Sequence, residues 1–379
     1  MVESGEKLKF RIGFDGRMLT LKMSGIGRYS LHLYQGLQEL KEPPEIEIYA
    51  SNKCEVGQRI QSSASVFSEN PLWRAVWGMP DWVREKKVDL YHATNYGSSP
   101  LGSLAVPWIL TVHDLAPIRH PEFCTTYFAL RAKFLLRHHI SRADYLIADS
   151  KSTREDILEL IGVSADRMSV IPLGVEERFL LPGDLNQEKA IRASYGLQWP
   201  YLLYVGVLHP RKNIQGLLQA FLQVCKERQD QEHRLVLVGP TEGKNNPVYK
   251  FVRENNLTNR VVFLGFVPDQ HLPSIYRGAT AFTYPSFYEG FGYPVLEALG
   301  CGAPVLTSKS SSLPEVAGPS SLLVDPYAPQ EIAEAISRII DDSWLREKMS
   351  REGKEWSRNF RWQTTVSRTF SVYQKVVSA

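Results

Sequence analysis

The sequence predicts an α/β protein made of two Rossmann-like domains, each built on a parallel sheet. Its 379 residues fit about two domains at ~150 residues each. Short runs rich in β-branched and aromatic residues alternate with amphipathic helical stretches, which is typical of strands joined by crossover helices. A segment rich in turn residues, 173–200, interrupts this alternation, which then restarts. We expect two such domains to face each other across a cleft.

The first domain is expected over residues 1–180. Its first helix is predicted over 26–40, because apolar residues recur there at steps of four, four and three. A later helix is predicted after residue 150, with either Ser150 or Ser152 as its cap. The expected strands of this domain are 9–15, 46–50, 89–93, 107–112 and 145–148.

The second domain is expected over residues 181–355. Its predicted strands are 201–206, 235–239, 261–265, 281–284, 303–307 and 321–324. A last helix is expected over 356–379. We expect it to pack back onto the first domain, with Trp356, Phe360, Trp362 and Phe370 as its aromatic anchors.

Composition excludes several classes of protein. The net charge is only 44 − 41 = +3, so nucleic acid is not expected as a partner. No apolar run reaches the ~18–20 residues of a membrane span, and the polar, acidic start lacks the pattern of a signal peptide. The isolated cysteines, at 54, 124, 225 and 301, indicate neither a disulfide framework nor a zinc site. A cytoplasmic location is therefore predicted.

Ligands of parallel sheets bind beyond the carboxyl ends of strands, and two loops there carry suitable side chains. The loop Gly206–Asn213 places Arg211 and Lys212 just before a predicted helix, where two cations and helix N–H groups suit a diphosphate. Taken alone, this loop is equally compatible with a solvated basic turn.

The second loop contains two carboxylates eight residues apart, Glu289 and Glu297, with Gly290 and Gly292 between them. Because Pro294 suits the first turn of a helix, Glu297 is expected in that turn. The two carboxylates are then placed to chelate hydroxyls of different parts of one ligand.

Together these motifs resemble a retaining glycosyltransferase of family 4 with the GT-B architecture. The matching segments are 25–29, 111–115, 170–175, 206–213, 287–297 and 312–316. They span nearly the whole chain in the family's order.

The resemblance implies a role for each matching residue. Arg211 and Lys212 would hold the diphosphate of a nucleotide-sugar donor, and Glu297 its ribose hydroxyls. Glu289, with the backbone of Gly290–Gly292, would bind the donor sugar or its phosphates.

Further donor contacts are implied on both domains. Gly27 would face the diphosphate from the first domain, because it has no Cβ to prevent a close approach. His113 would line the catalytic cleft near the transferred sugar. The nucleobase would bind near Phe266 and Val267, while Gly206 and Phe291 would complete the donor site.

The resemblance also implies same-face attack, with the leaving phosphate assisting deprotonation of the acceptor. Negative charge grows on the departing diphosphate, so fixed positive charge from Arg211 and Lys212 is the main catalytic contribution. Since these cations can replace a divalent ion, we expect no metal and no cofactor.

Donor and acceptor remain open at this stage. The loops after 206 and 287 are similar to bacterial mannosyltransferases of polysaccharide assembly, which favours GDP-mannose. The alternatives are a glucosyl or N-acetylglucosaminyl transferase that uses a UDP-sugar, a nucleotide-sugar epimerase, a glycan phosphorylase, or a binding subunit without activity.

Residues 119–142 combine five Lys or Arg and three His with interleaved apolar residues. Tyr127, Leu130, Phe134 and Ile140 are predicted to share one broad helix face. One interpretation is a crossover helix that packs on its sheet. The other is a peripheral contact with anionic lipid on the cytoplasmic face of the membrane, where a glycan or lipid-linked acceptor would be presented.

Overall fold

The computed structural model describes residues 10–19, 25–51, 65–67, 73–100, 102–228, 232–240 and 246–379. Lys9, predicted to begin the first strand, and Cys54 lie outside these ranges. The chain forms two compact units, one ending at Gly174 and joined by Trp362–Ala379, the other Val175–Arg361.

The described residues of the first unit include a seven-stranded sheet in which all the paired strands are parallel. The order β3-β2-β1-β4-β5-β6-β7 is that of a Rossmann sheet with an added edge strand. Its strands are β1 (Arg11–Asp15), β2 (Glu45–Ser51), β3 (Ser65–Phe67), β4 (Leu90–Ala93), β5 (Trp108–Val112), β6 (Tyr145–Ala148) and β7 (Met168–Val170). Its helices are α1 (Gly25–Gln38), α2 (Trp73–Glu85), α3 (Ala116–Arg119), α4 (Thr126–Arg142), α5 (Lys151–Leu160) and α15 (Trp362–Val377).

The second unit repeats this plan. Its six-stranded parallel sheet has the order β10-β9-β8-β11-β12-β13 within the described residues. The strands are β8 (Tyr201–Val205), β9 (Arg234–Val238), β10 (Val261–Gly265), β11 (Ala281–Tyr284), β12 (Val305–Ser308) and β13 (Leu322–Val324). The helices are α6 (Glu177–Leu180), α7 (Leu185–Ser194), α8 (Ile214–Arg228), α9 (Pro247–Glu254), α10 (Leu272–Arg277), α11 (Tyr293–Cys301), α12 (Leu313–Ala317), α13 (Pro329–Asp341) and α14 (Ser343–Ser357).

The predicted fold class of two Rossmann-like parallel-sheet domains is confirmed. All six strands predicted for the second unit are present. They could be predicted because buried strands of a parallel sheet are apolar runs in the sequence, and β8 and β11 are buried along their whole length. The edge strands β3 and β7 were not predicted. With three residues each, they are too short to show a period.

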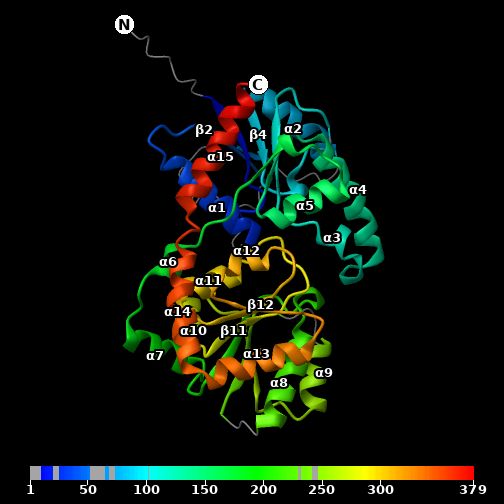
Figure 1. Ribbon diagram of the computed structural model, residues 1–379. Coiled ribbons are helices and arrows are strands. Elements are labelled where there is room, and N and C mark those ends of the chain that lie inside the picture. The colour runs from blue at the N-terminus through cyan, green and yellow to red at the C-terminus, as the bar shows by residue number, and fades with distance from the viewer. Residues whose placement is uncertain are drawn as a thin grey trace. The chain divides into compact units, whose positions relative to one another are not determined.

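The C-terminal helix belongs to the first unit only from Trp362 onward. Figure 1 shows α15 lying along α1. The Phe370 ring stacks on Phe10 with 5.7 Å between ring centroids, and the Tyr373 hydroxyl contacts His92 Nδ1 at 2.7 Å.

Two predicted anchors of this helix lie elsewhere, so that part of the prediction is wrong. Trp356 lies in the last turn of α14, and its Nε1 donates to the Val316 carbonyl at 2.9 Å. Phe360 packs against Phe291. Both are contacts within the second unit. The chain passes between the units at Gly174–Val175 and Arg361–Trp362, whereas 180–181 and 355–356 were expected.

None of the helices in the ranges described above is long and apolar enough to cross a membrane.

Candidate active site

The loops that follow β8, β11 and β12 meet at the carboxyl edge of the second sheet. Because β11 pairs with β8 on one side and β12 on the other, their following loops are neighbours. Strand order therefore brings residues 206–213, 285–292 and 309–312 together, although they are far apart in sequence.

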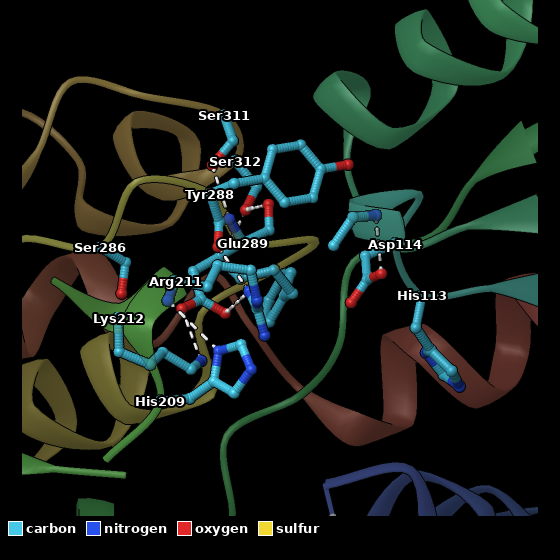
Figure 2. A network of polar contacts seen from close by, with 12 residues as sticks. His113, Asp114, His209, Arg211, Lys212, Ser286, Tyr288, Glu289, Ser311 and Ser312 are labelled. Atoms are coloured by element: carbon cyan, nitrogen blue, oxygen red, sulfur yellow. Dashed lines mark hydrogen bonds and ion pairs between the residues drawn. The ribbon is translucent and has the colours of Figure 1, made fainter. Parts of the chain in front are cut away.

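Figure 2 shows Arg211 and Lys212 directed at the Glu289 carboxylate. Arg211 Nη1 lies 3.1 Å from Glu289 Oε2, and Lys212 Nζ lies 2.5 Å from Oε1. Arg211 also donates to the Tyr288 carbonyl at 2.5 Å, and Lys212 to the Tyr284 hydroxyl at 2.7 Å. Two cations are thus held side by side by one buried anion, and the three side chains keep a net charge of +1.

The basic loop is held by its own backbone and by Asn213. Residues Pro210–Lys212 form a single 3₁₀ turn that ends at Asn213, which has the left-handed φ of 56°. The Asn213 amide donates to the Pro285 and Pro326 carbonyls at 3.0 and 2.6 Å, and its Oδ1 accepts from the Gly216 N–H. Asn213 therefore ties this loop to two other loops at the same edge.

Gly206 links the end of β8 to this loop with φ 152°, and its N–H donates to the Val238 carbonyl at 2.8 Å. A Cβ on the neighbouring Gly239 would overlap the Gly206 carbonyl. The prediction included Gly206 in the donor site, and the glycine pair allows the two loops to pass closely there.

Two serines fix the backbone around Glu289. Ser311 Oγ accepts from the Glu289 N–H at 2.9 Å, and Ser312 Oγ is 2.9 Å from both the Glu289 and Phe291 carbonyls. Gly292 is the N-cap residue that precedes α11, and it has a left-handed φ of 106°. A Cβ at this position would overlap the Leu313 side chain. Gly290 and Phe291 are buried within this turn.

The electrostatics of Glu289 follow from this arrangement. Burial alone would raise its pKa, but the charges of Lys212 and Arg211 outweigh burial and lower the pKa to about 2. Glu289 is therefore ionised across the physiological range. Such a carboxylate is a weak base, and it is suited to holding cations in place.

The sequence predicts Glu297 in the first turn of its helix, and the structure places it just beyond that turn. Helix α11 begins at Tyr293, so Glu297 is its fifth residue and is 3% exposed. Its Oε2 accepts a hydrogen bond of 2.9 Å from the Tyr276 hydroxyl on α10.

Phe266 and Val267, predicted near the nucleobase, follow β10 and differ in environment. Phe266 is 78% exposed, whereas Val267 is buried. Gly265, the last residue of β10, has a left-handed φ of 64°. An exposed aromatic ring beside a buried aliphatic residue leaves the ring face available for stacking.

In the first unit, His113 follows β5 and is held on both sides by the loops after the neighbouring strands. Its Nε2 donates to the Thr94 carbonyl at 2.8 Å, and its Nδ1 lies 2.6 Å from Asp149 Oδ2. Burial opposes protonation of His113, but the Asp149 carboxylate outweighs it and raises the pKa. Because a carbonyl oxygen can only accept, Nε2 carries a proton, and Nδ1 faces the Asp149 carboxyl group, so both ring nitrogens are engaged within the protein.

The strands behind His113 share a buried chain of hydrogen bonds. Thr111 Oγ1 is 2.9 Å from the Tyr29 hydroxyl and 2.8 Å from His92 Nε2. Burial and the charge of His113 lower the pKa of His92 to about 3, so this ring stays neutral. Gly27 is buried two residues before Tyr29 in α1, and the Tyr29–Thr111 hydrogen bond fixes this helix to the sheet.

Sequence reasoning missed Asp149, Tyr284 and Ser311. Asp149 directly follows β6, and residues at the carboxyl ends of parallel strands are candidate site residues. The same reasoning that selected His113 could therefore have selected Asp149. Tyr284 ends β11, where it reads as one more apolar residue of the strand. Ser311 had no local signal, because its role depends on contact with a loop 22 residues away.

Comparison with known families divides the chain at the same place as the fold. A profile described as "Glycosyltransferase Family 4" matches residues 23–179, and one described as "Glycosyl transferases group 1" matches residues 187–356.

The chain resembles characterised transferases over most of its length. It is 30% identical to O-antigen chain mannosyltransferase B of Escherichia coli, covering 96% of this chain and 99% of that protein. It is 27% identical to the D-inositol 3-phosphate glycosyltransferase of Corynebacterium glutamicum (strain R), covering 79% and 76%. In fold it matches Anabaena Alr3699/HepE, solved in complex with UDP and glucose, with a TM-score of 0.79, 19% identity, and coverage of 97% and 100%.

Proposed function

We propose, from the premise that this chain belongs to glycosyltransferase family 4, that it transfers mannose from GDP-mannose to a glycan or lipid-linked acceptor. The chain is a hexosyltransferase with the GT-B fold. The donor sugar, the retaining stereochemistry and the independence from metal are our proposals. The paired cations at Glu289 are the observation that supports the stereochemistry and the independence from metal, and sequence similarity supports the donor sugar.

Arg211 and Lys212 would stabilise the leaving nucleoside diphosphate. Glycosyl transfer passes through an oxocarbenium-like transition state, and negative charge grows on the departing phosphate as the bond breaks. The two cations lie within hydrogen-bonding distance of one carboxylate and carry a net positive charge with it. Cations that are already oriented need little reorganisation when that charge develops.

The state of Glu289 supports same-face transfer rather than double displacement. A covalent intermediate needs a nucleophilic carboxylate, but both oxygens of Glu289 are engaged by cations and its pKa is about 2. In our proposal Glu289 orients the two cations and contacts the donor, and the leaving phosphate accepts the proton of the acceptor hydroxyl. Arg211 and Lys212 take the place of a divalent ion, so activity should persist in excess EDTA.

Other donor contacts are proposed by position. Glu297 would bind the ribose hydroxyls, Phe266 and Val267 the base, and Gly206 with Gly290–Gly292 the phosphates or sugar. Gly27 and His113 are the contacts proposed for the first unit. With both ring nitrogens engaged by Thr94 and Asp149, His113 would contact the sugar as a positioned ring and not as a general base.

The identity of the donor is supported by sequence similarity. The relative that shares 30% identity over nearly the whole chain is a mannosyltransferase of O-antigen chains, which favours GDP-mannose. The complex of Alr3699/HepE with UDP keeps a UDP-sugar as the alternative.

The exposed face of α4 supports a peripheral contact with an anionic membrane. Tyr127 and Phe134 are each 76% exposed and Leu130 is 57% exposed, while Ile140 is buried against the sheet. The prediction that Ile140 shares this face is therefore wrong. The three exposed apolar side chains lie on one side of the helix, and Arg131 and Arg137 flank them. Such a surface would hold the enzyme where a lipid-linked acceptor is presented.

The test compares nucleotides and then donors. GDP, UDP and ADP are added to the purified chain and the shift in Tm is measured, since stabilisation grows as RT ln(1 + [L]/Kd). We expect GDP to give the largest shift, and GDP-mannose to be consumed in the presence and absence of EDTA. A shift with UDP and none with GDP would replace the proposed donor by a UDP-sugar. Conversion of the donor to an isomeric sugar nucleotide without acceptor would indicate an epimerase.

A further inference from the structure

A second concave surface of the second unit lies at the opposite edge of its sheet from the donor loops. This pocket has a volume of about 1180 Å³. Its wall includes Tyr201, which begins β8, and Thr280 and Pro304, which directly precede β11 and β12. We call it the basal pocket. Because all these strands are parallel, the basal pocket and Arg211–Lys212 are separated by the length of a strand, about 16 Å for five residues.

The basal pocket is strongly basic. Helices α7 and α14 contribute most of its charged side chains, and two acids, Glu347 and Glu355, accompany six cations. These cations are Lys189, Arg192, Arg346, Arg351, Lys354 and Arg358. The formal balance is therefore 6 − 2 = +4, in a chain whose total net charge is +3.

The cations are only partly compensated by the protein. Three of the six form ion pairs: Arg358 with Glu355 at 2.8 Å, Arg192 with the buried Glu188 at 3.6 Å, and Arg351 with Glu352 at 3.8 Å. Arg346 donates to two carbonyls at the end of α13. Lys189 and Lys354 form no ion pair with any residue in the described part of the chain. Like charges gathered in a concavity repel one another, and an anion bound there would relieve this repulsion.

Two glycines make room for cationic side chains along the wall. A Cβ at Gly278 would overlap Arg192 Cδ, and a Cβ at Gly302 would overlap Lys354 Cε. Gly302 also has a left-handed φ of 77°, which other residues rarely adopt. The backbone thus allows Arg192 and Lys354 to lie flat against the strand ends.

We propose that the basal pocket binds a ligand with a diphosphate or several phosphate groups, at a site separate from the donor. Arg and Lys side chains from two helices are the groups that recognise phosphate oxygens. The volume exceeds that of a phosphate group alone, so the ligand carries an organic part as well, which Leu197 and Trp199 would contact. The ligand is either a soluble phosphate ester or the head group of an anionic lipid.

The test uses inorganic pyrophosphate as the probe and isothermal titration calorimetry as the readout. Every protein carries Lys212→Ala, which weakens binding of diphosphate in the donor loop, so the result does not depend on the proposed function. Lys189→Gln with Lys354→Gln removes two exposed pocket cations from two helices. The matched control, Lys250→Gln with Lys348→Gln, removes two cations of the same unit that do not line the pocket.

We expect the pocket variant to weaken the Kd for pyrophosphate at least roughly tenfold and the control to leave it unchanged. Equal Kd values in the pocket variant and the control, or no binding in either, would overturn the proposal. Co-sedimentation with phosphatidylcholine vesicles, with and without cardiolipin, whose head group carries two phosphates, then distinguishes a lipid head group from a soluble phosphate. All proteins in this assay also carry Arg131→Gln, Lys133→Gln and Arg137→Gln, so that α4 does not hold the vesicles. Loss of vesicle binding in the pocket variant alone then identifies a lipid head group, and equal vesicle binding in the pocket variant and the control identifies a soluble phosphate.

Discussion

Lys212 donates to Glu289 at 2.5 Å across 77 residues of sequence, and Arg211 contacts the other oxygen of the same carboxylate. Glu289 is 6% exposed, so the position of both cations depends on a single buried anion. The pairing joins the loops after β8 and β11, which are adjacent strands. The protein's own contacts therefore fix the positions of Arg211 and Lys212.

Glu289→Gln should lower both stability and turnover. The variant keeps the shape of the side chain but leaves two cations without their counter-charge, at a cost on the order of 3 kcal/mol in the free energy of unfolding. Chemical denaturation measures this cost. Glu254→Gln, which removes one partner of an exposed ion pair, is the control and should change stability by less than about 1 kcal/mol. Equal stability of the two variants would show that Glu289 does not hold the cations.

Glu297→Gln should raise the KM for the donor with little change in kcat. Contacts to ribose persist from the ground state to the transition state, so their loss weakens binding in both. The amide can still accept the hydrogen bond from Tyr276, which keeps the helix pair intact. Steady-state kinetics at varied donor concentration measures KM and kcat separately. An unchanged KM with collapsed kcat would remove Glu297 from the ribose site.

The His113–Asp149 pair should make stability depend on pH in a defined direction. The folded pKa of His113 is raised above its unfolded value of about 6.5. The pair therefore stabilises the fold fully below that value, and the contribution is lost as pH rises through the folded pKa. Denaturation at about pH 6 and about pH 9 should show a larger loss for the native chain than for Asp149→Asn. Parallel pH profiles for the two proteins would contradict this account of the pair.

The exposed face of α4 should bind anionic vesicles. Changing Arg131, Lys133 and Arg137 to Gln should abolish co-sedimentation with anionic liposomes at low salt, since each cation contributes about 1 kcal/mol near the surface. Binding should also weaken at high salt, because screening shortens the range of the charges. Phe134→Ser tests the apolar part separately. A native chain that stays in the supernatant with anionic liposomes at low salt would leave α4 without a membrane role.

The sequence could predict the strands and the loops that carry chemistry, because buried parallel strands read as apolar runs and sites follow their carboxyl ends. It placed Arg211, Lys212 and Glu289 in loops that the structure brings together. The exact start of a helix is harder to predict, which is why Glu297 was expected in the first turn of α11 and is instead its fifth residue.

Contacts that depend on strand order could not be predicted from local patterns. Ser311 reaches the Glu289 backbone only because β12 pairs with β11, and Asp149 reaches His113 only because β6 pairs with β5. The same reason explains the error at Trp356, near the domain boundary. An aromatic residue in a helical stretch indicates that the side chain is buried, but the sequence does not indicate that its partner is the Val316 carbonyl of the second unit.

The most direct test of the account is the kcat of Arg211→Ala and Lys212→Ala with the cognate donor. If fixed positive charge stabilises the leaving diphosphate, each variant should lose roughly 10²-fold in kcat, which is the usual effect of removing one electrostatic donor. Lys250→Ala, which removes an exposed cation of α9 that pairs with Glu254, is the control and should keep its activity. Near-native kcat in both Arg211→Ala and Lys212→Ala would contradict the proposed mechanism.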